Sequence, residues 1–299
     1  MSEWVFLNGN LVSRDQAKVD IYDHGFLYGD GIFEGIRAYD RRIFKLDDHV
    51  ARLYRSAKGL NFRICIEPKE FRAAIIDTVR ANELESGYIR VTVTRGVGLG
   101  LDPSHIDCTS TVVISVRGST KQTPDKFRLY PDEAYEKGLE VITASTRVPP
   151  AHAIDPQIKS TGKYINSIAA KMEANRVGAG EALMLNVEGR VAEATGDNLF
   201  LIRDGELITP PTTEGALPGI TRAVVIDSAL KLGIPFAEKQ ISLFDCYTAD
   251  EAFLTGTAAE VIPMVVLDSR EIGDGKPGPT TNRLIHAFRE ATRTDGPEV

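Results

Sequence analysis

Tight-turn dipeptides between short apolar runs are the feature that most constrains this fold. Asn8-Gly9 separates two apolar runs near the N-terminus, and Glu188-Gly189 and Asp204-Gly205 occupy similar places later in the chain. Such dipeptides favour the two-residue turns of antiparallel hairpins. A further hairpin is expected between Gly31 and Lys45, around Asp40-Arg41. Antiparallel sheets are therefore expected in both halves of the chain.

Helical periodicity separates these hairpins. Asp47 is expected to cap a helix that runs to Leu60, with an apolar face formed by Val50, Leu53, Tyr54 and Ala57. Other expected elements are a helix within 67–84, strands over 88–94, 111–116 and 139–144, and a helix that Pro218-Gly219 opens and Gly233 ends. The tail after Arg293 is expected to fray. The pattern predicts an α+β protein.

Chain length favours two domains. A chain of 299 residues is long for one hydrophobic core. Residues 117–133 are polar, contain two prolines and show little periodicity, which is typical of a linker. We predict a small N-terminal α/β domain over 1–120, an interdomain linker over 121–133 and a large domain over 134–299. A cleft between the domains is the expected site.

Charge and hydropathy exclude several partners. The net charge of −7 and the lack of a Lys/Arg block argue against nucleic acid. No run approaches the ~20 apolar residues of a membrane span, and the first residues do not resemble a signal peptide. Cys65, Cys108 and Cys246 are widely spaced, which favours reduced thiols in the cytoplasm. The five histidines lack metal-ligand spacing, so no metal site is expected.

Four fragments of the C-terminal half together suit one ligand. IKSTGKYINS (158–167) offers an amine from Lys159 or Lys163, and the pattern alone does not choose between them. VAEATGDNLF (191–200) offers the carboxylate of Glu193, while ALPGITR (216–222) and LTGTAAE (254–260) offer backbone cradles for an anion. Pyridoxal 5′-phosphate (PLP) carries an aldehyde, a ring nitrogen and a phosphate that need this set. The expected chemistry is amino-group transfer.

The chain resembles the class IV aminotransferases, which are fold-type IV PLP enzymes, and most closely the branched-chain amino acid aminotransferases. The resemblance runs from about Phe6 to His286 and rests on seven motifs in family order. They are YGDGIFEGIRAY (28–39), HVARLYRSAK (49–58), YIRVTVTRGVGLGLDP (88–103), IKSTGKYINS, VAEATGDNLF, LPGITR (217–222) and TGTAAE (255–260). The resemblance implies a two-domain α+β fold with the active site at the domain interface, in a homodimer or higher homo-oligomer.

The resemblance also implies roles around the cofactor. The family's PLP-binding lysine stands five residues before the tyrosine of its Y-x-N-S element, which selects Lys159 as the covalent and catalytic lysine and leaves Lys163 in solvent. Tyr164 is implied to contact the ring hydroxyl oxygen, and Glu193 to keep the ring nitrogen protonated. The phosphate contacts are implied to come from Arg52, Gly219, Ile220, Thr221, Gly256 and Thr257.

Substrate contacts follow from the same resemblance. An apolar wall around a branched side chain is implied for Tyr28, Phe33, Tyr88 and Leu101, and the neighbouring subunit is implied to supply Tyr28 and Leu101. Arg90 is implied to pair with the distal carboxylate of glutamate or 2-oxoglutarate. The amides of Thr257 and Ala258 are implied to meet the α-carboxylate, and Gly35 to allow close approach. The run GVGLG (96–100) is implied to form a substrate loop.

The expected activity is transamination between leucine, isoleucine or valine and 2-oxoglutarate. D-amino acid or (R)-amine transaminases and aminodeoxychorismate lyase share the cofactor half and are the alternatives within the fold. The YIR (88–90) and FEGIR (33–37) elements favour the branched-chain interpretation. A non-catalytic binding protein of the same fold is the alternative of another class. It would be expected to lack Lys159 or Glu193, and both are present.

Overall fold

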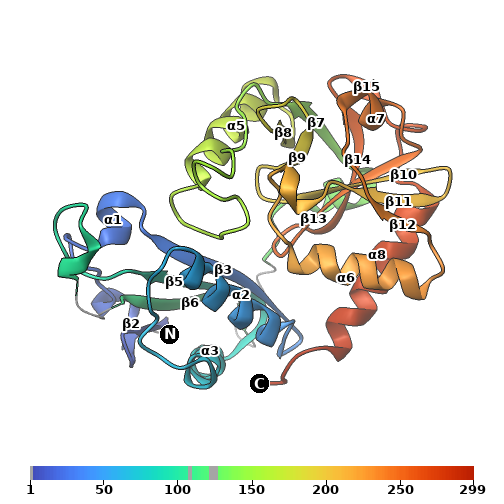
Figure 1. The fold of residues 1–299 in the computed structure, drawn as a ribbon. Helices are drawn as coiled ribbons and strands as arrows, with labels where there is room; N and C mark the ends of the chain where they lie inside the picture. Colours follow the sequence, from blue (N-terminus) through green and yellow to red (C-terminus); the bar gives the residue numbers. More distant parts are fainter. Residues whose placement is uncertain (1–2, 107–109, 121–126) are drawn as a thin grey trace. The chain divides into compact units, whose positions relative to one another are not determined.

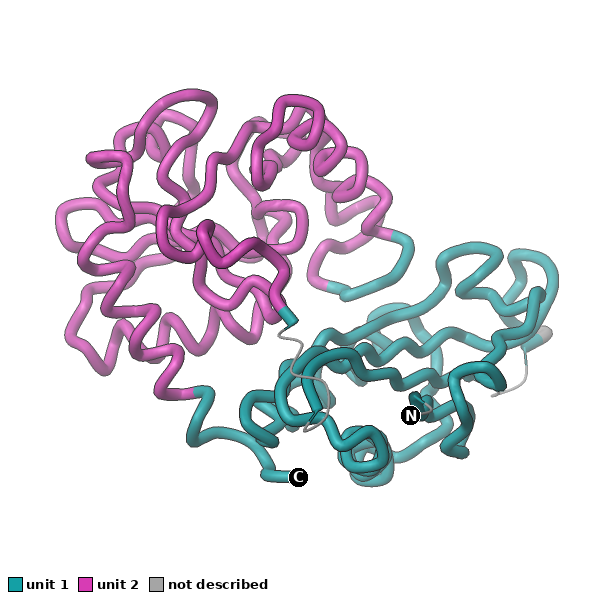
Figure 2. The backbone as a smooth tube through the Cα atoms, turned by 180° about the vertical axis from the view of Figure 1, so that it is seen from behind, with its two compact units in different colours: residues 1–127, 158–162, 292–299 teal, residues 128–157, 163–291 magenta. Residues whose placement is uncertain are grey.

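The computed structural model describes residues 3–106, 110–120 and 127–299 and has the predicted mixture of helices and sheets (Figure 1). The chain forms two compact units (Figure 2). Unit 1 comprises residues 1–127, 158–162 and 292–299, and unit 2 comprises 128–157 and 163–291. Residues 121–126 of the predicted linker lie outside the described residues.

Unit 1 is built on a six-stranded sheet in the order β2-β1-β6-β5-β3-β4, in which all paired strands are antiparallel. Its elements are β1 (Trp4–Leu7), β2 (Asn10–Ser13), η1 (Arg14–Gln16), α1 (His24–Tyr28), β3 (Gly31–Tyr39), β4 (Arg42–Ile43), α2 (Leu46–Gly59), α3 (Pro68–Ala81), β5 (Leu84–Thr94), η2 (Pro103–His105) and β6 (Val112–Thr120). Its core includes Ile36, Leu53, Phe71 and Ile89, which come from strands and helices alike. The sheet therefore packs against the apolar faces of α2 and α3.

The predicted hairpins of unit 1 are confirmed. Asn8 and Gly9 join β1 to β2, and Asp40 and Arg41 join β3 to β4. All four residues have positive φ, between 46° and 96°. A type I′ turn requires this at both central positions, and its twist matches that of the strands it joins.

The start of α2 differs from the prediction. The helix begins at Leu46 after Lys45, which has φ +54°, so Asp47 lies in the first turn and is not the cap. The Asp47 carboxylate instead accepts a 2.7 Å hydrogen bond from Arg72 on α3. The predicted apolar face is confirmed, because Val50, Leu53 and Ala57 are buried and Tyr54 is partly buried against the core.

Unit 2 contains a nine-stranded sheet in the order β12-β11-β10-β13-β14-β7-β8-β9, with β15 pairing with β14. Its strands are β7 (Leu139–Thr143), β8 (Glu181–Leu185), β9 (Val191–Ala194), β10 (Asn198–Arg203), β11 (Glu206–Thr209), β12 (Phe236–Glu238), β13 (Glu251–Gly256), β14 (Glu260–Leu267) and β15 (Arg270–Glu271). Its helices are α4 (Asp132–Lys137), α5 (Tyr164–Val177), η3 (Thr212–Glu214), α6 (Ile220–Lys231), α7 (Leu243–Tyr247) and α8 (Pro279–Thr294), whose last residues group with unit 1. The predicted turn at Asp204-Gly205 and the stop at Gly233 are confirmed, because these residues have positive φ.

The expected fraying after Arg293 is wrong. The Ile43 amide donates to the Pro297 carbonyl at 3.0 Å, and the Val299 amide donates to the Arg41 carbonyl at 2.8 Å. Val299 is buried in the core of unit 1. A terminal segment that pairs its backbone with a hairpin and buries an apolar side chain is held in place.

The cysteines also differ from the prediction. Cys65 is disulfide-bonded, so the expectation of a reduced thiol is wrong there. Its amide lies 3.2 Å from Ser110 Oγ, a proximity across 45 residues that spacing in the sequence does not indicate. Cys108 lies outside the described residues. Cys246 is free, and burial raises the pKa of its thiol to about 12, which makes it unreactive.

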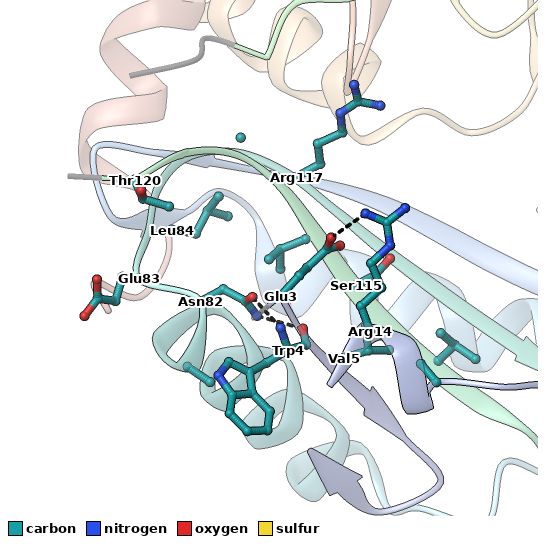
Figure 3. A pocket seen from close by; sticks show the side chains of 15 residues that line it. Glu3, Trp4, Val5, Arg14, Asn82, Glu83, Leu84, Ser115, Arg117 and Thr120 are labelled. Atoms are coloured by element: carbon teal, nitrogen blue, oxygen red, sulfur yellow. Dashed lines mark hydrogen bonds and ion pairs between the residues drawn. The ribbon is translucent and has the colours of Figure 1, made fainter. Parts of the chain in front are cut away.

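A hollow of about 1150 Å³ lies on unit 1, and its lining includes Glu3, Arg14, Asn82, Glu83, Ser115 and Arg117 (Figure 3). None of the predicted site residues lines it. Within the described ranges, no helix combines the length and the apolar character that crossing a bilayer requires.

Candidate active site

Four predicted substrate residues lie on one face of the unit 1 sheet. In the register of β3 and β5, Gly35 pairs with Arg90 and Phe33 pairs with Thr92. Side chains alternate along a strand, so Phe33, Gly35, Tyr88 and Arg90 share a face. The Arg90 guanidinium carbon lies 3.6 Å from the centre of the Phe33 ring, a cation–π contact. This face combines an aromatic surface with a cation.

Gly35 makes room for Tyr88. A Cβ atom built at Gly35 would lie 2.1 Å from the Tyr88 hydroxyl and 2.7 Å from the ring carbon that carries it. The Tyr88 ring also stacks on Phe127 with centroids 5.1 Å apart. The group that approaches Gly35 in this unit is therefore the Tyr88 ring. The close approach of a substrate to Gly35 stays a prediction.

Lys159 belongs to unit 1 because residues 158–162 run beside β3. The Phe33 amide donates to the Lys159 carbonyl at 3.0 Å, and the Lys159 amide lies 3.3 Å from Ser56 Oγ on α2. Lys159 Nζ lies 4.7 Å from the centre of the Phe33 ring. The predicted catalytic amine and the Arg90 guanidinium therefore flank the same aromatic ring.

Arg52 is held by a buried acid. It lies on the face of α2 that carries His49 and Ser56, and all three residues are buried. Its Nε and one terminal nitrogen donate to the two oxygens of Glu34 at 2.7 Å each, and His49 Nδ1 lies 2.8 Å from Glu34 Oε2. Burial alone would raise the pKa of Glu34, but Arg52 and His49 outweigh it and lower that pKa to about 2. The carboxylate therefore stays ionised and fixes the guanidinium.

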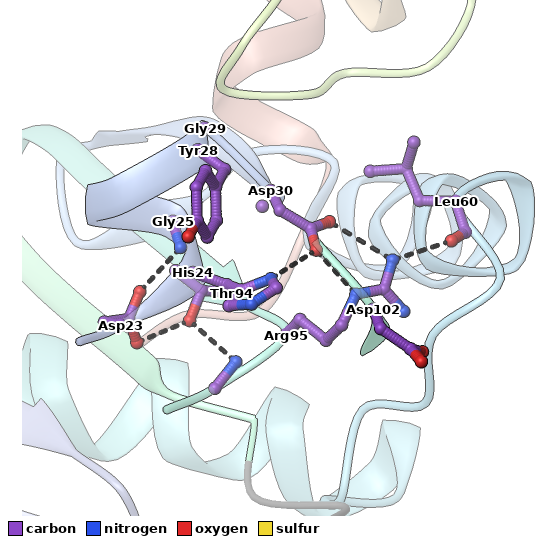
Figure 4. A network of polar contacts seen from close by, with 12 residues as sticks. Asp23, His24, Gly25, Tyr28, Gly29, Asp30, Leu60, Thr94, Arg95 and Asp102 are labelled. Atoms are coloured by element: carbon purple, nitrogen blue, oxygen red, sulfur yellow. Dashed lines mark hydrogen bonds and ion pairs between the residues drawn. The ribbon is translucent and has the colours of Figure 1, made fainter. Parts of the chain in front are cut away.

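A polar network joins Asp30 to His24 and Arg95, beside Tyr28 (Figure 4). Asp30 accepts hydrogen bonds from Arg95 at 2.6 and 3.2 Å and lies 3.2 Å from His24 Nδ1. The Gly100 amide donates to the Tyr28 hydroxyl at 3.1 Å. Asp23 pairs with Val97 across an isolated β-bridge. The network connects α1 to residues 95–100 within unit 1.

Unit 2 contains the predicted ring-nitrogen carboxylate. Glu193 lies on β9, and its Oε2 accepts hydrogen bonds from the Leu217 amide at 2.8 Å and from Asn198 Nδ2 at 3.3 Å. Its Oε1 lies 3.6 Å from Lys163 Nζ. The expectation that Lys163 is solvated is wrong, since this side chain is 5% exposed and donates to the Pro156 carbonyl at 2.7 Å. Lysine side chains are ordinarily exposed, but Lys163 is buried beside the Glu193 carboxylate and the Pro156 carbonyl.

Asn198 supports the turn that precedes α6. Its Nδ2 also donates to the Leu217 carbonyl at 2.9 Å, and its Oδ1 would lie 2.1 Å from a Cβ atom at Gly219. Gly219 is the N-cap of α6, and no side chain caps this end. The first amides of a helix lack acceptors within the helix, so this end suits a phosphate. Ile220 and Thr221, both predicted phosphate residues, form its first turn.

The second predicted cradle is the turn between β13 and β14. Thr257 and Ala258 lie in this turn, and Gly256 pairs with Glu260 at its base. A Cβ atom at Gly256 would lie 1.9 Å from Asp197 Oδ1, so only glycine fits beside that carboxylate. Thr255 Oγ1, one residue earlier, is buried and lacks a hydrogen-bond partner in the described part of the chain. A glycine turn next to an unpaired hydroxyl fits an anionic ligand.

Comparison with known proteins identifies the family. A putative branched-chain-amino-acid aminotransferase of Methanocaldococcus jannaschii is 43% identical over 96% of this chain and 95% of its own length. A crystal structure of the Escherichia coli branched-chain amino acid aminotransferase is similar with a TM-score of 0.91 and 36% identity, covering 97% of this chain and 94% of that one. The branched-chain amino acid aminotransferase from Thermobaculum terrenum, in its PLP-form, has a TM-score of 0.85 and 33% identity, covering 97% and 94%. Residues 31–266 match the model of the amino-transferase class IV family, and the chain belongs to this family.

Proposed function

We propose that this protein is a PLP-dependent aminotransferase that moves the amino group of leucine, isoleucine or valine to 2-oxoglutarate. The observation that carries this proposal is that the Phe33 ring contacts both the Arg90 guanidinium and the Lys159 amine. A transaminase with two substrates must take an apolar and an acidic side chain in turn. An aromatic wall with a cation stacked on it accommodates the apolar chain, and the cation pairs with the acidic one.

When bound, PLP supplies the electron sink for the bond that breaks at the substrate Cα. Lys159 Nζ would hold the cofactor covalently and, once released, would take the proton from the substrate Cα. Glu193 would hold a proton at the ring nitrogen, and Tyr164 would contact the ring hydroxyl oxygen. Lys159 and Tyr164 are five residues apart, so their Cα atoms lie at most about 18 Å apart in any conformation. That limit allows both to serve one cofactor.

The phosphate is assigned to backbone and side-chain donors. They are Gly219, Ile220 and Thr221 at the start of α6, Gly256 and Thr257 after β13, and Arg52 as the fixed charge. The start of α6 supports this assignment, because no side chain caps this end and the first amides of a helix suit an anion. The Glu34 ion pair gives the Arg52 guanidinium a defined orientation.

The substrate α-carboxylate is assigned to the amides of Thr257 and Ala258, and the side chain to the face of Phe33, Tyr88 and Arg90. Tyr28 and Leu101 are assigned to the site of a neighbouring subunit, so the active form is a homodimer or a higher homo-oligomer. Both residues are exposed in the single chain, with 41% and 81% of their surface accessible, as this assignment requires. A cytoplasmic location stays a prediction from the sequence, and cell fractionation tests it.

Replacement of Lys159 by alanine tests the function. The wild-type protein should be labelled at Lys159 when borohydride reduces the lysine–PLP bond, and peptide mapping should find the label there. Lys159→Ala should lose the label, the yellow colour and at least about a thousandfold of the transamination rate. A label on Lys163, or a yellow and active Lys159→Ala variant, would remove the assignment.

A donor panel tests the substrate class. Leucine, D-alanine and (R)-phenylethylamine should be compared at equal concentration with 2-oxoglutarate as acceptor. Leucine should react with the highest kcat/KM. A preference for D-alanine or the (R)-amine would favour the related transaminases, and release of pyruvate from aminodeoxychorismate would favour the lyase.

A further inference from the structure

Lys163 is a buried cation that the proposed mechanism does not use. It is the residue before α5, and its side chain is 5% exposed. Its Nζ donates to the Pro156 carbonyl at 2.7 Å and lies 3.6 Å from Glu193 Oε1. It also lies 5.4 Å from the centre of the Tyr164 ring. Lys163 therefore stands between the two unit 2 residues that are assigned to the cofactor ring.

Glu193 is approached from two directions. One carboxylate oxygen accepts from the Leu217 amide and from Asn198, and the other faces Lys163. The first two donors are neutral and are fixed by the turn before α6. Lys163 contributes the positive charge on this side. A largely buried carboxylate is costly unless a cation or several donors compensate it.

We propose that Lys163 is a positioning residue that holds the Glu193 carboxylate oriented toward the cofactor's ring nitrogen. The inference rests on the proposed function, since it assigns Lys163 to the ring-nitrogen carboxylate. Lys163 acts through Glu193 and does not touch the reacting atoms. The Pro156 carbonyl fixes the ammonium group, so Lys163 presents its charge to Glu193 from a defined position.

The geometry explains why Lys163 does not compete with Lys159 for the cofactor aldehyde. An amine must reach the carbonyl carbon that it attacks. Lys163 Nζ is instead held by the Pro156 carbonyl at 2.7 Å and lies 3.6 Å from Glu193 Oε1. These two contacts keep the group beside Glu193.

A double-mutant cycle on cofactor affinity tests the inference. The apparent Kd for PLP should be measured by absorbance titration of cofactor-free wild type, Lys163→Met, Glu193→Gln and the double variant. Methionine keeps the length of the side chain without its charge. Lys163→Met should weaken PLP binding about tenfold in the wild-type background and less than about twofold in the Glu193→Gln background. Equal weakening in both backgrounds would mean a merely structural role and would overturn the proposal.

Thermal unfolding of the four cofactor-free proteins gives a second readout. The double variant should unfold at a higher temperature than Lys163→Met, because the amide removes the uncompensated charge of Glu193. Lys171→Met is the matched control, since Lys171 lies on α5, which Lys163 immediately precedes, and pairs with Glu181 at 3.7 Å. It should change PLP affinity less than about twofold. An equal loss in Lys171→Met would contradict a specific role for Lys163.

The two proposals fail in different ways. If wild type binds no PLP and borohydride labels no lysine, the proposed function fails, and the unfolding cycle still tests the contact between Lys163 and Glu193. If wild type binds PLP at Lys159 and Lys163→Met binds it equally well, only the role of Lys163 fails.

Discussion

Glu34 lies in a strand whose residues from Gly31 to Ala38 are all buried, yet it is ionised. Its carboxylate accepts two hydrogen bonds from the Arg52 guanidinium, and His49 Nδ1 lies 2.8 Å from one of its oxygens. An uncompensated charge at this position would be strongly destabilising. The ion pair therefore links the fold of unit 1 to the side chain that is assigned to the cofactor phosphate.

Glu34→Gln should destabilise the protein and change how its stability depends on pH. The pKa of Glu34 is lowered from 4.5 to about 2, so its ionisation stabilises the fold above pH 4.5. This contribution, about 3 kcal/mol, is lost as the pH falls from about 4.5 to about 2. Urea unfolding of wild type and Glu34→Gln at pH 7 and at pH 3 measures it. The difference in unfolding free energy should shrink at pH 3, and a constant difference would contradict the argument.

At the scale of elements, α1 and the segment 95–100 form one substructure. The Asp30 carboxylate accepts a hydrogen bond from Arg95 and lies 3.2 Å from His24 Nδ1. Arg95 also donates to the Leu60 carbonyl at 3.0 Å. These contacts tie the start of β3 to the end of α2 and to the loop that carries Leu101. The loop's position thus depends on one carboxylate with two partners, His24 and Arg95, and Arg95 extends the network to Leu60.

Asp30→Asn should loosen this loop without affecting cofactor binding. The amide cannot accept from Arg95 as an ion, so the hydrogen bonds that hold the loop weaken. We expect kcat/KM for leucine to fall about tenfold and the PLP affinity to stay within about twofold. Steady-state kinetics and PLP titration measure the two quantities. Asp274→Asn is the control, since Asp274 is an exposed residue of unit 2 whose carboxylate accepts from the Lys276 amide at 3.2 Å; an equal loss in this variant would count against the network.

At the scale of the whole molecule, unit 1 exposes apolar side chains around α1 and the loop after β5. Ile21, Phe26, Leu99 and Leu101 have between 66% and 81% of their surface accessible. The Gly98 amide donates to the Tyr22 carbonyl, so the two segments adjoin. Large apolar side chains exposed on adjoining segments suit an interface, and a second copy of the chain is the proposed partner.

Phe26→Glu should weaken the proposed oligomer, because it places a charge among these exposed apolar side chains. The protein should sediment as a smaller species at micromolar concentration, and transamination should fall in parallel. Phe244→Glu is the matched control, because Phe244 lies on α7 in unit 2 and is equally exposed, at 71% against 72% for Phe26. A Phe26→Glu variant that keeps the size and the activity of wild type would contradict the proposed interface.

Local patterns in the sequence were enough to predict the hairpins and helix faces. The turns at Asn8-Gly9 and Asp204-Gly205 have the positive φ angles that these dipeptides favour, and the face of α2 at Val50, Leu53 and Ala57 is buried. These features depend on residues close together in the chain. The start of α2 was missed because Lys45 adopts a left-handed conformation that its residue type does not indicate.

Contacts between distant residues were decided by the tertiary structure alone. Lys163 is buried because Glu193, thirty residues away in the sequence, lies beside its ammonium group, and Arg52 is oriented by Glu34 from another element. The last residues are ordered by the hairpin of β3 and β4. Backbone preferences and periodicity act over a few residues and can be read from the sequence. The burial of a charge depends on which group lies opposite it in space, and only the folded chain brings those groups together.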